Sequence, residues 1–317
     1  MTTPVPRCAV VIPTYNCADY LPAALESIAA QGVADIEVIV IDDGSSDDTA
    51  AILKRAATMP GLGRLRCFET RQIGPGLARN LAVEVARAPL IAFLDADDVW
   101  LPGKLEAQLA FHESQPDVVL SFTDYRHRGP TGDDRGTCFG FWGHEAAQAY
   151  SLLPRAASVL VGCNLIGTST VVVDRAAFME ANGFGGEMPS SEDWDLWLKL
   201  ARLGPIALTG QVGCDYLMRP NSVTAARANR ITAMEIILER ALEAHPKPDS
   251  RDVRRARARI VTAKAEHARE QGNILRATLG HAAALALDPS VRGLRATIAD
   301  LGRWALRPVF RDAARRA

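Results

Sequence analysis

Polar and acidic side chains follow three apolar runs of the sequence, at the points where buried strands would end. The apolar runs are Cys8–Ile12, Ile36–Ile41 and Leu90–Leu94, and they are followed by Pro13-Thr14-Tyr15-Asn16, Asp42-Asp43-Gly44-Ser45-Ser46 and Asp95-Ala96-Asp97-Asp98. In an open parallel sheet, ligands bind beyond the carboxyl ends of the strands. Several carboxylates at one edge repel each other unless a cation is present, and Mg²⁺ or Mn²⁺ prefers oxygen ligands and often bridges substrate phosphates. The pattern therefore predicts a divalent-cation site for a phosphorylated substrate.

The first 124 residues alternate strand and helix patterns, which predicts the scaffold for these turns. Continuous apolar strands are buried on both faces, so the alternation favours a mostly parallel sheet flanked by helices. The predicted strands are Cys8–Ile12, Ile36–Ile41, Leu65–Phe68, Leu90–Leu94 and Val118–Phe122, and the predicted helices are Asp19–Gln31, Asp47–Thr58, Pro75–Arg87 and Pro102–Ser114.

The pattern changes twice along the rest of the chain. Residues 125–225 are less regular, with predicted strands at Ser169–Val173 and Ile206–Thr209 and a predicted helix at Glu192–Leu203. From about Arg227 the sequence is rich in Ala and Arg and reads as helical. We predict an α/β domain over residues 1–225 and a basic helical region over 226–317.

Charge is also distributed unevenly along the chain, although the formal net charge is only −1. Residues 251–317 carry 15 Lys/Arg and 6 Asp/Glu, which leaves 21 basic and 31 acidic residues in 1–250. Such asymmetry indicates two roles, or one role and a docking surface. The basic part lacks interleaved aromatic residues and any known nucleic-acid motif, so no nucleic-acid partner is expected.

The spacing of the cysteines and the N-terminal residues give an expectation for the cellular location of the protein. The six cysteines are scattered without a Cys-x-x-Cys pair, which disfavours a disulfide framework and a structural zinc site. The first residues do not form the apolar core of a signal peptide, and no stretch has the apolar length of a membrane span. The expected location is the cytoplasm, with peripheral contact at the inner membrane face left open.

The glycine pattern excludes two common phosphate-binding sites. The sequence has no Gly-x-x-x-x-Gly-Lys-Ser/Thr loop, and no Gly-x-Gly-x-x-Gly follows the first strand. A nucleotidyltransferase that makes sugar nucleotides would need an N-terminal phosphate loop rich in glycine and lysine, and none is present. These absences disfavour P-loop NTPases, dinucleotide-binding Rossmann domains and such nucleotidyltransferases.

Five motifs in order resemble those of the family 2 glycosyltransferases, enzymes of GT-A fold that use nucleotide sugars. They are Pro13-Thr14-Tyr15-Asn16, Asp42-Asp43-Gly44-Ser45-Ser46-Asp47, Gly76-Leu77-Ala78-Arg79-Asn80, Phe93-Leu94-Asp95-Ala96-Asp97-Asp98 and Ser191-Glu192-Asp193-Trp194-Asp195. The resemblance covers about residues 8–224. It implies a GT-A sheet with a Rossmann-like nucleotide half, about 1–124, and an acceptor half, about 125–225.

The resemblance implies roles for the donor side of the site. Asp97, the second aspartate of the D-x-D, would be the principal metal ligand. Asp95 would share the metal or face the ribose. Asp42 would meet the nucleotide base, and Arg79 would lie near the phosphates or brace the aspartates. Pro13, Thr14 and Tyr15 would line the base pocket.

The acidic segment that opens the Glu192–Leu203 helix supplies the candidate general base. The resemblance favours Asp193, which would take a proton from the acceptor hydroxyl as that oxygen attacks the anomeric carbon. A single displacement of this kind inverts the anomeric centre. Trp194 and Trp197 lie three residues apart on one helical face, and we favour core positions for both.

One position departs from the pattern of many relatives. Those relatives have Tyr-Arg-x-His-Pro-Gly-Ser after the acidic helix, and the histidine can ligate the metal. Here Arg219 stands where the histidine would be. Arginine does not ligate metals but can grip a diphosphate with two nitrogens. We expect Arg219 to contact the diphosphate of the donor, and the metal to have fewer protein ligands.

The acceptor and the helical tail are less determined by the sequence. Asn164, Thr168, Ser169 and Thr170 precede or begin a strand that would face the acceptor, a glycan or a lipid-linked sugar, although they also fit ordinary strand residues. Leu294, Ile298 and Leu301 repeat on one helical face beside arginines, which suits either an anionic membrane or the acidic domain. The leading hypothesis is an inverting, metal-assisted glycosyltransferase using a UDP-sugar to build a polysaccharide, glycan or glycolipid. The alternative is a catalytically silent module of the same fold.

Overall fold

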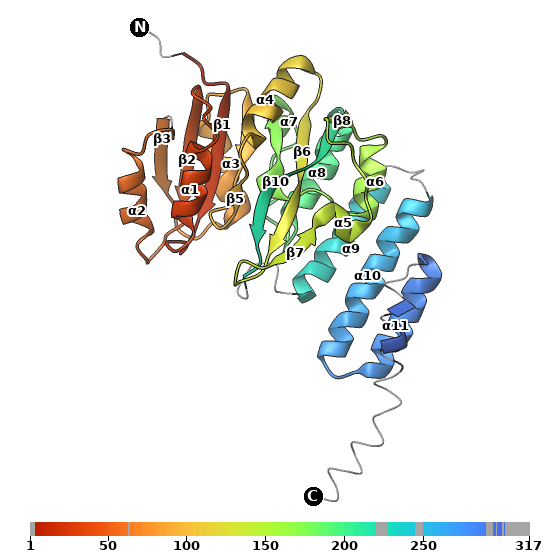
Figure 1. Ribbon diagram of the computed structural model, residues 1–317. Coiled ribbons are helices and arrows are strands. Elements are labelled where there is room, and N and C mark those ends of the chain that lie inside the picture. The colour runs from red at the N-terminus through yellow and green to blue at the C-terminus, as the bar shows by residue number, and fades with distance from the viewer. Residues whose placement is uncertain are drawn as a thin grey trace, which may run out of the picture. The chain divides into compact units, whose positions relative to one another are not determined.

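A computed structural model of the chain describes residues 4–62, 64–219, 227–244, 250–289, 294–295, 297–299 and 301 (Figure 1). The chain forms two compact units. The first comprises Met1–Leu160, Asn164–Met188 and Glu192–Ser222, and the second comprises Val161–Cys163, Pro189–Ser191 and Val223–Ala317. The functional division predicted near residue 225 stays a prediction.

The first unit contains a ten-stranded sheet whose long path has the order β3-β2-β1-β4-β9-β6-β10-β5. Strands β1 to β4 pair in parallel, β9 runs antiparallel to both β4 and β6, and β10 runs parallel to β6. The bounds are β1 Cys8–Thr14, β2 Ile36–Asp42, β3 Arg64–Glu69, β4 Leu90–Phe93, β5 Val99–Trp100, β6 Leu120–Arg128, β7 Asp134–Thr137, β8 Ser151–Leu152, β9 Val172–Asp174 and β10 Ile206–Leu217.

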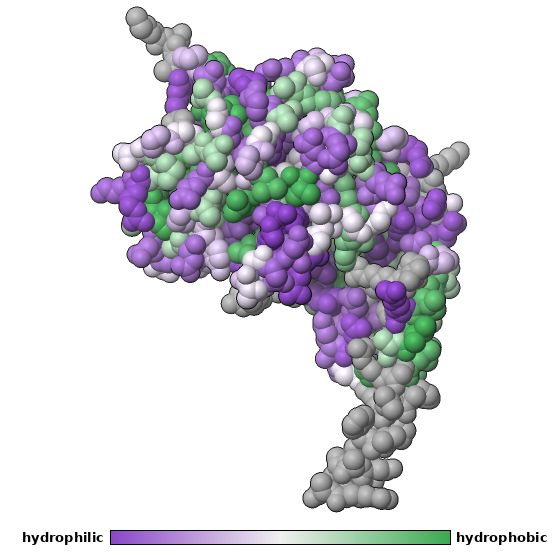
Figure 2. Space-filling view, in the orientation of Figure 1, coloured by the Kyte–Doolittle hydropathy of each residue, from purple (hydrophilic) through white to green (hydrophobic). Residues whose placement is uncertain are grey.

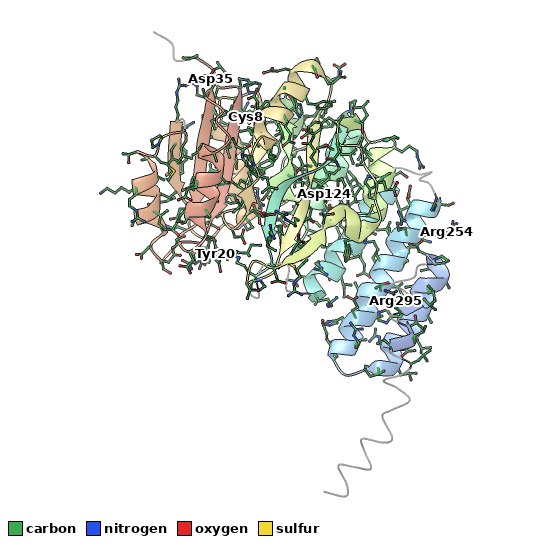
Figure 3. All side chains as sticks on the ribbon, in the orientation of Figure 1. Cys8, Tyr20, Asp35, Asp124, Arg254 and Arg295 are labelled. Carbon is green, nitrogen blue, oxygen red and sulfur yellow. The ribbon has the colours of Figure 1, made fainter. Side chains whose placement is uncertain are left out.

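This topology brings the ends of strands from both halves of the sheet to one side. Because β9 opposes both of its neighbours, β4 and β6 point the same way. The carboxyl ends of β1, β2, β3, β4, β6 and β10 therefore share one edge, which we name the carboxyl edge. Figure 3 shows Asp35, just before β2, at the opposite end of the sheet from Tyr20, which follows the β1 turn.

Helices cover both faces of the sheet because its strands are apolar on both sides. On one face, alternate β1 residues such as Val10 and Ile12 pack with Leu25 and with residues of two further helices. On the other face, Phe93 of β4 packs against Phe178 and Trp197, with ring centroids 5.8 and 6.5 Å away. The first face carries α1 (Leu21–Ala29), α2 (Thr49–Ala56) and α4 (Lys104–Ser114), and the second carries α3 (Pro75–Val85), α7 (Arg175–Glu180) and α8 (Glu192–Leu203).

The strand predicted over Ser169–Val173 is wrong in its first half. Residues Thr168–Thr170 form the 3₁₀ turn η1, and only Val172–Asp174 form the strand β9. The Thr168 carbonyl accepts the Val171 N–H at 3.2 Å, which closes the turn before the strand begins. Two short helices, α5 (Cys138–Trp142) and α6 (Ala156–Gly162), lie between β7 and η1 in the chain.

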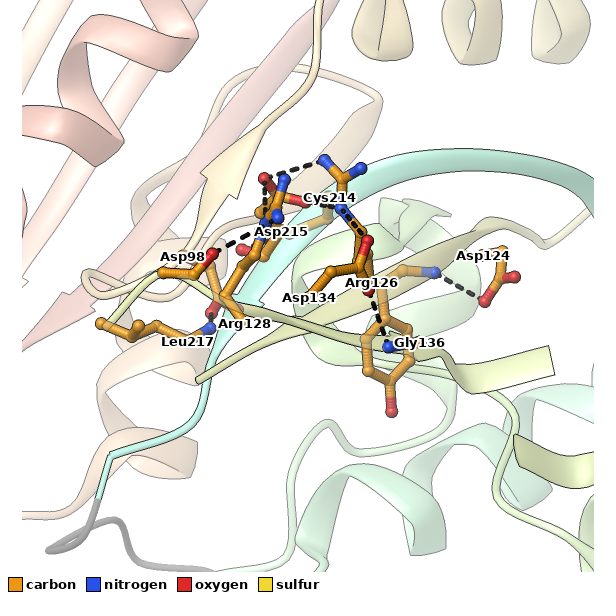
Figure 4. Close-up of polar contacts among 11 residues, drawn as sticks. Asp98, Asp124, Arg126, Arg128, Asp134, Gly136, Cys214, Asp215 and Leu217 are labelled. Atoms are coloured by element: carbon orange, nitrogen blue, oxygen red, sulfur yellow. Dashed lines mark hydrogen bonds and ion pairs between the residues drawn. The ribbon is translucent and has the colours of Figure 1, made fainter. Parts of the chain in front are cut away.

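Strands β6 and β10 run well beyond the apolar runs that predicted them. The predicted strands end at Phe122 and Thr209, whereas β6 continues to Arg128 and β10 to Leu217. An ion-pair cluster holds the polar continuation: Asp215 accepts Arg126 Nε at 2.8 Å and Arg128 Nε at 3.1 Å (Figure 4). Hydropathy does not predict a strand segment that is stabilised by ion pairs between polar residues.

The second unit is helical, with α9 (Arg227–Ala244), α10 (Ser250–Glu270) and α11 (Ile274–Leu287). Helices α10 and α11 approach closely through small residues, since a Cβ on Gly280 would lie 2.8 Å from the Ala265 Cβ. The Lys264–Glu235 ion pair joins α10 to α9 at 2.5 Å. Across the described parts of the chain, no helix is both long enough and apolar enough to cross a membrane.

Candidate active site

The turns after β1 and β2 are joined by hydrogen bonds at the carboxyl edge. Asn16 Oδ1 accepts the Ser46 N–H at 2.8 Å, and Ser45 Oγ accepts the Asn16 N–H at 2.9 Å. Asp42 Oδ1 accepts the Ser45 N–H at 3.0 Å, and Asp42 lies opposite Thr14 in the strand register. The predicted base-pocket residues on β1 and β2 are therefore neighbours.

The side chains at the end of β1 and in the turn that follows differ in their exposure and in their hydrogen bonding. Thr14 is buried, and its hydroxyl has no hydrogen-bond partner within the described ranges. The Tyr15 ring is 46% exposed, and its hydroxyl accepts Gln72 Nε2 at 3.0 Å. Pro13 is buried opposite Ile41. A buried hydroxyl and an exposed ring on one turn could contact the edge and face of a nucleobase.

Asp43 organises the loop that leads into α3. Its carboxylate accepts the Thr70 hydroxyl at 2.6 Å and the N–H groups of Ile73 and Gly74 at 2.8 and 2.7 Å. Asp47 likewise accepts the N–H groups of Ala18 and Thr49. These two acids hold turns.

Arg79 binds two acidic residues beneath the carboxyl edge. The Arg79 side chain is only 6% exposed, and its Nη2 lies 2.5 Å from Asp95 Oδ1. Its Nη1 lies 3.7 Å from Glu192 Oε1, and its guanidinium sits 5.2 Å from the centroid of the Phe184 ring. Gly76 permits this approach of α3 to α8, because a Cβ there would lie 3.1 Å from Glu192 Cγ. Arg79 thus pairs with both Asp95 and Glu192, and its role in the site stays a prediction.

Asp97 forms an ion pair with Arg219, the residue that departs from the family pattern. Arg219 Nε lies 2.6 Å from Asp97 Oδ2, and the guanidinium lies 5.1 Å from the centroid of the Tyr20 ring. Arg219 Nη1 also lies 3.9 Å from Cys17 Sγ. Burial and the nearby Asp95 raise the pKa of Asp97, and Arg219 opposes that shift. Arg219 therefore stands beside the predicted principal metal ligand.

Asp98 faces inward, unlike Asp97. It is 1% exposed, accepts the Ser169 hydroxyl at 2.5 Å and accepts the Leu217 N–H at 3.2 Å (Figure 4). Burial, together with the negative charges of Asp97 and Asp95, raises its pKa well above the usual range. Asp98 connects the loop after β4 to β10 and does not face a substrate.

Asp193 lies in the first turn of α8 with few partners. Its carboxylate accepts the Trp194 N–H at 2.7 Å and the Thr168 hydroxyl at 3.3 Å. Burial, followed by the charge of Glu192, raises the pKa of Asp193 to about 7, while the Trp194 N–H and Arg79 act in the opposite direction. A carboxylate with that pKa can accept a proton at neutral pH.

Helix α8 is anchored so that this carboxylate has a fixed position. Trp194 and Trp197 are 4% and 0% exposed, which confirms the core positions favoured from their spacing. The Trp194 indole N–H donates to the Leu160 carbonyl at 2.7 Å. Asp195, also buried, pairs with Lys199 at 2.7 Å.

The donor set at the carboxyl edge fits a cation that also binds the substrate. Within the described residues, no group of three or more His, Cys, Asp or Glu side chains could hold a metal ion. Asp95 and Asp97 are nevertheless close enough for the charge of Asp95 to raise the pKa of Asp97. Mg²⁺ is commonly held by one or two carboxylates together with substrate phosphates and water. Asp97 and Asp95 suit such an arrangement.

Several contacts of the site have no signal in the sequence. The tie of Ser169 to Asp98, the Glu192–Arg79 pair and the Tyr20 ring beneath Arg219 each join residues far apart in the chain. Ser169, one of the candidates for the acceptor side, is 3% exposed and contacts the loop after β4. Only the three-dimensional arrangement reveals these partners.

Comparison with known proteins agrees with this geometry. The chain is 29% identical over 233 residues to the Escherichia coli UDP-Glc:alpha-D-GlcNAc-diphosphoundecaprenol beta-1,3-glucosyltransferase WfaP, covering 73% of this chain and 85% of WfaP. It is 30% identical over 202 residues to E. coli chondroitin synthase, covering 63% of this chain and only 27% of that longer protein.

A solved structure shares the fold. The mannosyltransferase PcManGT from Pyrobaculum calidifontis, determined in complex with GDP-Man and Mn²⁺, superposes with a TM-score of 0.66 at 22% identity, covering 96% of this chain and 81% of PcManGT. This likeness shows that the α/β sheet and its helices form a GT-A fold. Residues 9–169, about half of the sequence, match Glycosyl transferase family 2. The chain belongs to this family and is a glycosyltransferase.

Proposed function

We propose that the protein transfers a sugar from a UDP-sugar to an acceptor hydroxyl with inversion, assisted by Mg²⁺ or Mn²⁺. The observation that carries the proposal is Asp193, a half-buried carboxylate at the start of α8 whose pKa is raised to about 7. It shares the first turn of α8 with Glu192, which contacts the same arginine as Asp95. A proton acceptor thus stands next to the residues suited to a diphosphate.

The proposed nucleotide pocket lies on β1 and β2. Pro13, Thr14 and Tyr15 line it, with Asp42 meeting the base. The unpartnered Thr14 hydroxyl and the exposed Tyr15 ring support this assignment, because a bound base would satisfy the first and stack on the second. UDP is favoured because the name of WfaP specifies UDP-Glc as its donor.

The diphosphate would bind between the aspartates and Arg219. Asp97 and Asp95 would hold the metal, which when bound neutralises charge on the departing diphosphate. Arg219, with its ion pair to Asp97 in the free enzyme, would turn its guanidinium to the phosphates. Arg79 would keep Asp95 in place from below.

Asp193 would act on the acceptor side of the donor. The acceptor oxygen forms a bond to the anomeric carbon while the bond from that carbon to the β-phosphate oxygen breaks. The hydroxyl proton passes to an Asp193 carboxylate oxygen, and the nucleoside diphosphate leaves. Attack from the side opposite the leaving group inverts the configuration, through a transition state with oxocarbenium character.

A panel of nucleotide sugars tests this function. Calorimetry with each UDP- and GDP-sugar in the presence of Mn²⁺ would measure binding, and release of free nucleotide would measure turnover. We expect one UDP-sugar to bind and to be consumed, with NMR of the product showing the inverted anomer. Binding without turnover, even with lipid-linked and glycan acceptors, would favour the catalytically silent module.

We also propose that the helical region brings the enzyme to its acceptor at the cytoplasmic face of a membrane. The name of WfaP specifies a diphosphoundecaprenol-linked acceptor. Leu275 and Leu279 on α11 are 55% and 63% exposed, and apolar side chains gather over this helix in Figure 2. Leu294, Ile298 and Leu301 are exposed as well. Apolar residues beside arginines suit an anionic lipid surface.

Flotation with vesicles tests the membrane contact. The full chain should float with vesicles that contain about 30% phosphatidylglycerol, a fraction that gives the vesicles a strong negative surface charge. Removal of residues 290–317 takes away Leu294, Ile298 and Leu301 but leaves Leu275 and Leu279, so it should reduce flotation and leave UDP binding unchanged. Absence of flotation for both forms would refute membrane contact without affecting the proposed chemistry.

A further inference from the structure

The 3₁₀ turn η1 contacts the loop that carries the D-x-D aspartates. Ser169 Oγ accepts the Asp95 N–H at 3.0 Å and donates to Asp98 Oδ2 at 2.5 Å. The Ser169 carbonyl accepts the Trp100 indole N–H at 2.6 Å. A serine hydroxyl has one proton to donate, so this group is committed to the loop and not to a substrate.

The residue before Ser169 contacts the proposed base. The Thr168 hydroxyl donates to Asp193 Oδ2 at 3.3 Å. Thr168 and Ser169 are 8% and 3% exposed, so both hydroxyls act inside the protein. Two consecutive side chains thus reach the two parts of the site that must act on one donor molecule.

The turn itself is held in a fixed shape. The Thr170 hydroxyl and N–H both donate to the Gly167 carbonyl, at 2.7 and 2.9 Å. Gly167 packs against the Tyr125 ring so closely that a Cβ would lie 2.9 Å from Tyr125 Cε1. Glycine therefore permits the close approach of this turn to β6, where a larger residue would clash.

The loop after β4 depends on this turn for its shape. The Asp98 N–H donates to the Asp95 carbonyl at 3.0 Å, which closes a short turn around Asp97. Ser169 holds both ends of that turn, through the Asp95 N–H and the Asp98 carboxylate. The position of the Asp97 side chain then follows from the backbone that Ser169 fixes.

We propose that Ser169 and Thr168 are positioning residues that set the distance between the D-x-D aspartates and Asp193. The inference rests on the proposed function, in which those aspartates hold the metal and diphosphate while Asp193 deprotonates the acceptor. A reaction between a bound donor and an acceptor is sensitive to a misplacement of about 1 Å. One rigid turn that contacts both the aspartate loop and Asp193 limits such misplacement.

Ser169→Ala and Ser169→Cys test the contact with the loop. Ser121→Ala is the matched control, because Ser121 is also buried and its hydroxyl contacts Gln108 and His112 of α4 at 3.0 Å each, not the loop that carries the aspartates. Calorimetry with UDP and Mn²⁺ should show about tenfold weaker binding in both Ser169 variants and less than twofold change in the control. Ser169→Cys nearly preserves the side-chain volume, and thermal unfolding would confirm that each variant folds.

Thr168→Val tests the contact with Asp193, with Thr209→Val as its control, because Thr209 is also buried and its hydroxyl donates to the Gln148 carbonyl at 2.7 Å. The carboxyl ¹³C signal of Asp193, assigned by its absence in Asp193→Asn, reports the protonation midpoint. Removing a donor to the ionised form should raise that midpoint by about half a pH unit or more in Thr168→Val and leave it unchanged in Thr209→Val. UDP–Mn²⁺ affinity should stay within twofold in both.

The outcomes separate this inference from the proposed function. A wild-type enzyme that binds no nucleotide diphosphate with Mn²⁺ would refute the proposed function. Wild-type binding with equal affinity in Ser169→Ala and Ser121→Ala would overturn the role of Ser169. A midpoint that does not move in Thr168→Val would overturn the role of Thr168.

Discussion

The two ends of the site use the same residue type in different surroundings. On the donor side, Asp95 and Asp97 each face a guanidinium, from Arg79 and Arg219. On the acceptor side, the hydrogen bonds to the Asp193 carboxylate come from a backbone N–H and a hydroxyl. Burial raises the pKa of both Asp97 and Asp193, but the paired Arg219 guanidinium opposes the shift at Asp97, whereas the Asp193 carboxylate accepts these hydrogen bonds from neutral groups.

This difference shows how one sheet edge can both bind an anion and remove a proton. An aspartate paired with an arginine can bind a cation, and the arginine can leave the aspartate to contact the phosphates of the substrate. A half-buried aspartate whose pKa is raised to about 7 exchanges its proton at neutral pH. Substitutions at the donor-side aspartates and at Asp193 should therefore impair different steps of the reaction.

The largest effect is expected for Asp193→Asn. Loss of the only proposed proton acceptor should reduce turnover by about a thousandfold, while UDP–Mn²⁺ affinity stays within about threefold. Asp195→Asn makes the same chemical change two residues along α8, at a carboxylate paired with Lys199, and should retain turnover within about threefold. Equal losses in the two variants would show that α8, and not the Asp193 carboxylate, carries the effect.

The next largest effect is expected for Asp97→Asn. Weaker binding of the cation should lower turnover at fixed Mn²⁺ by about a hundredfold, and higher Mn²⁺ should restore part of it. Asp48→Asn, at the exposed cap of α2, is the control. Unchanged Mn²⁺ dependence in Asp97→Asn would remove Asp97 from the metal site.

The pH dependence of turnover should report the acceptor side alone. The base works only when ionised, so turnover should rise with pH through the Asp193 pKa of about 7. A single group of that pKa gives a rise of about tenfold between pH 6 and 8. UDP–Mn²⁺ affinity should change far less between pH 7 and 8. A turnover profile that falls with pH in this range would contradict the role of Asp193 as base.

How far the sequence predicts the molecule differs between these two ends. The strands that end in Thr14, Asp42 and Phe93 follow from continuous apolar runs, and the turns after them carry local motifs. The contacts that decide each aspartate's environment are long-range, and 122 positions separate Asp97 from Arg219 in the numbering.

The acceptor half shows the same limit in its secondary structure. The run Ser169–Val173 has strand composition, but hydrogen bonds to the Gly167 and Thr168 carbonyls close a 3₁₀ turn first. The extension of β10 depends on Asp215 meeting arginines of β6. Neither the 3₁₀ turn nor the extension of β10 can be predicted from local propensity or hydropathy.

The smallest effect, and the one that most sharpens the comparison, is expected for Arg219→Gln. Loss of a charge-assisted contact should weaken UDP–Mn²⁺ binding by about tenfold. Without nucleotide the sign should reverse, because Asp97 no longer has its counter-charge: Mn²⁺ alone should bind more tightly to Arg219→Gln than to the wild type.

Arg219→Lys separates charge from shape in that comparison. Lysine keeps the positive charge but not the two-nitrogen grip, so it should weaken UDP–Mn²⁺ binding while Mn²⁺ alone binds as to the wild type. Calorimetry with Mn²⁺ alone, UDP alone and both together measures all three affinities. If Arg219→Gln weakens Mn²⁺ binding in the absence of UDP, the guanidinium does not compete with the cation for Asp97, and the pairing of the donor-side aspartates is structural only.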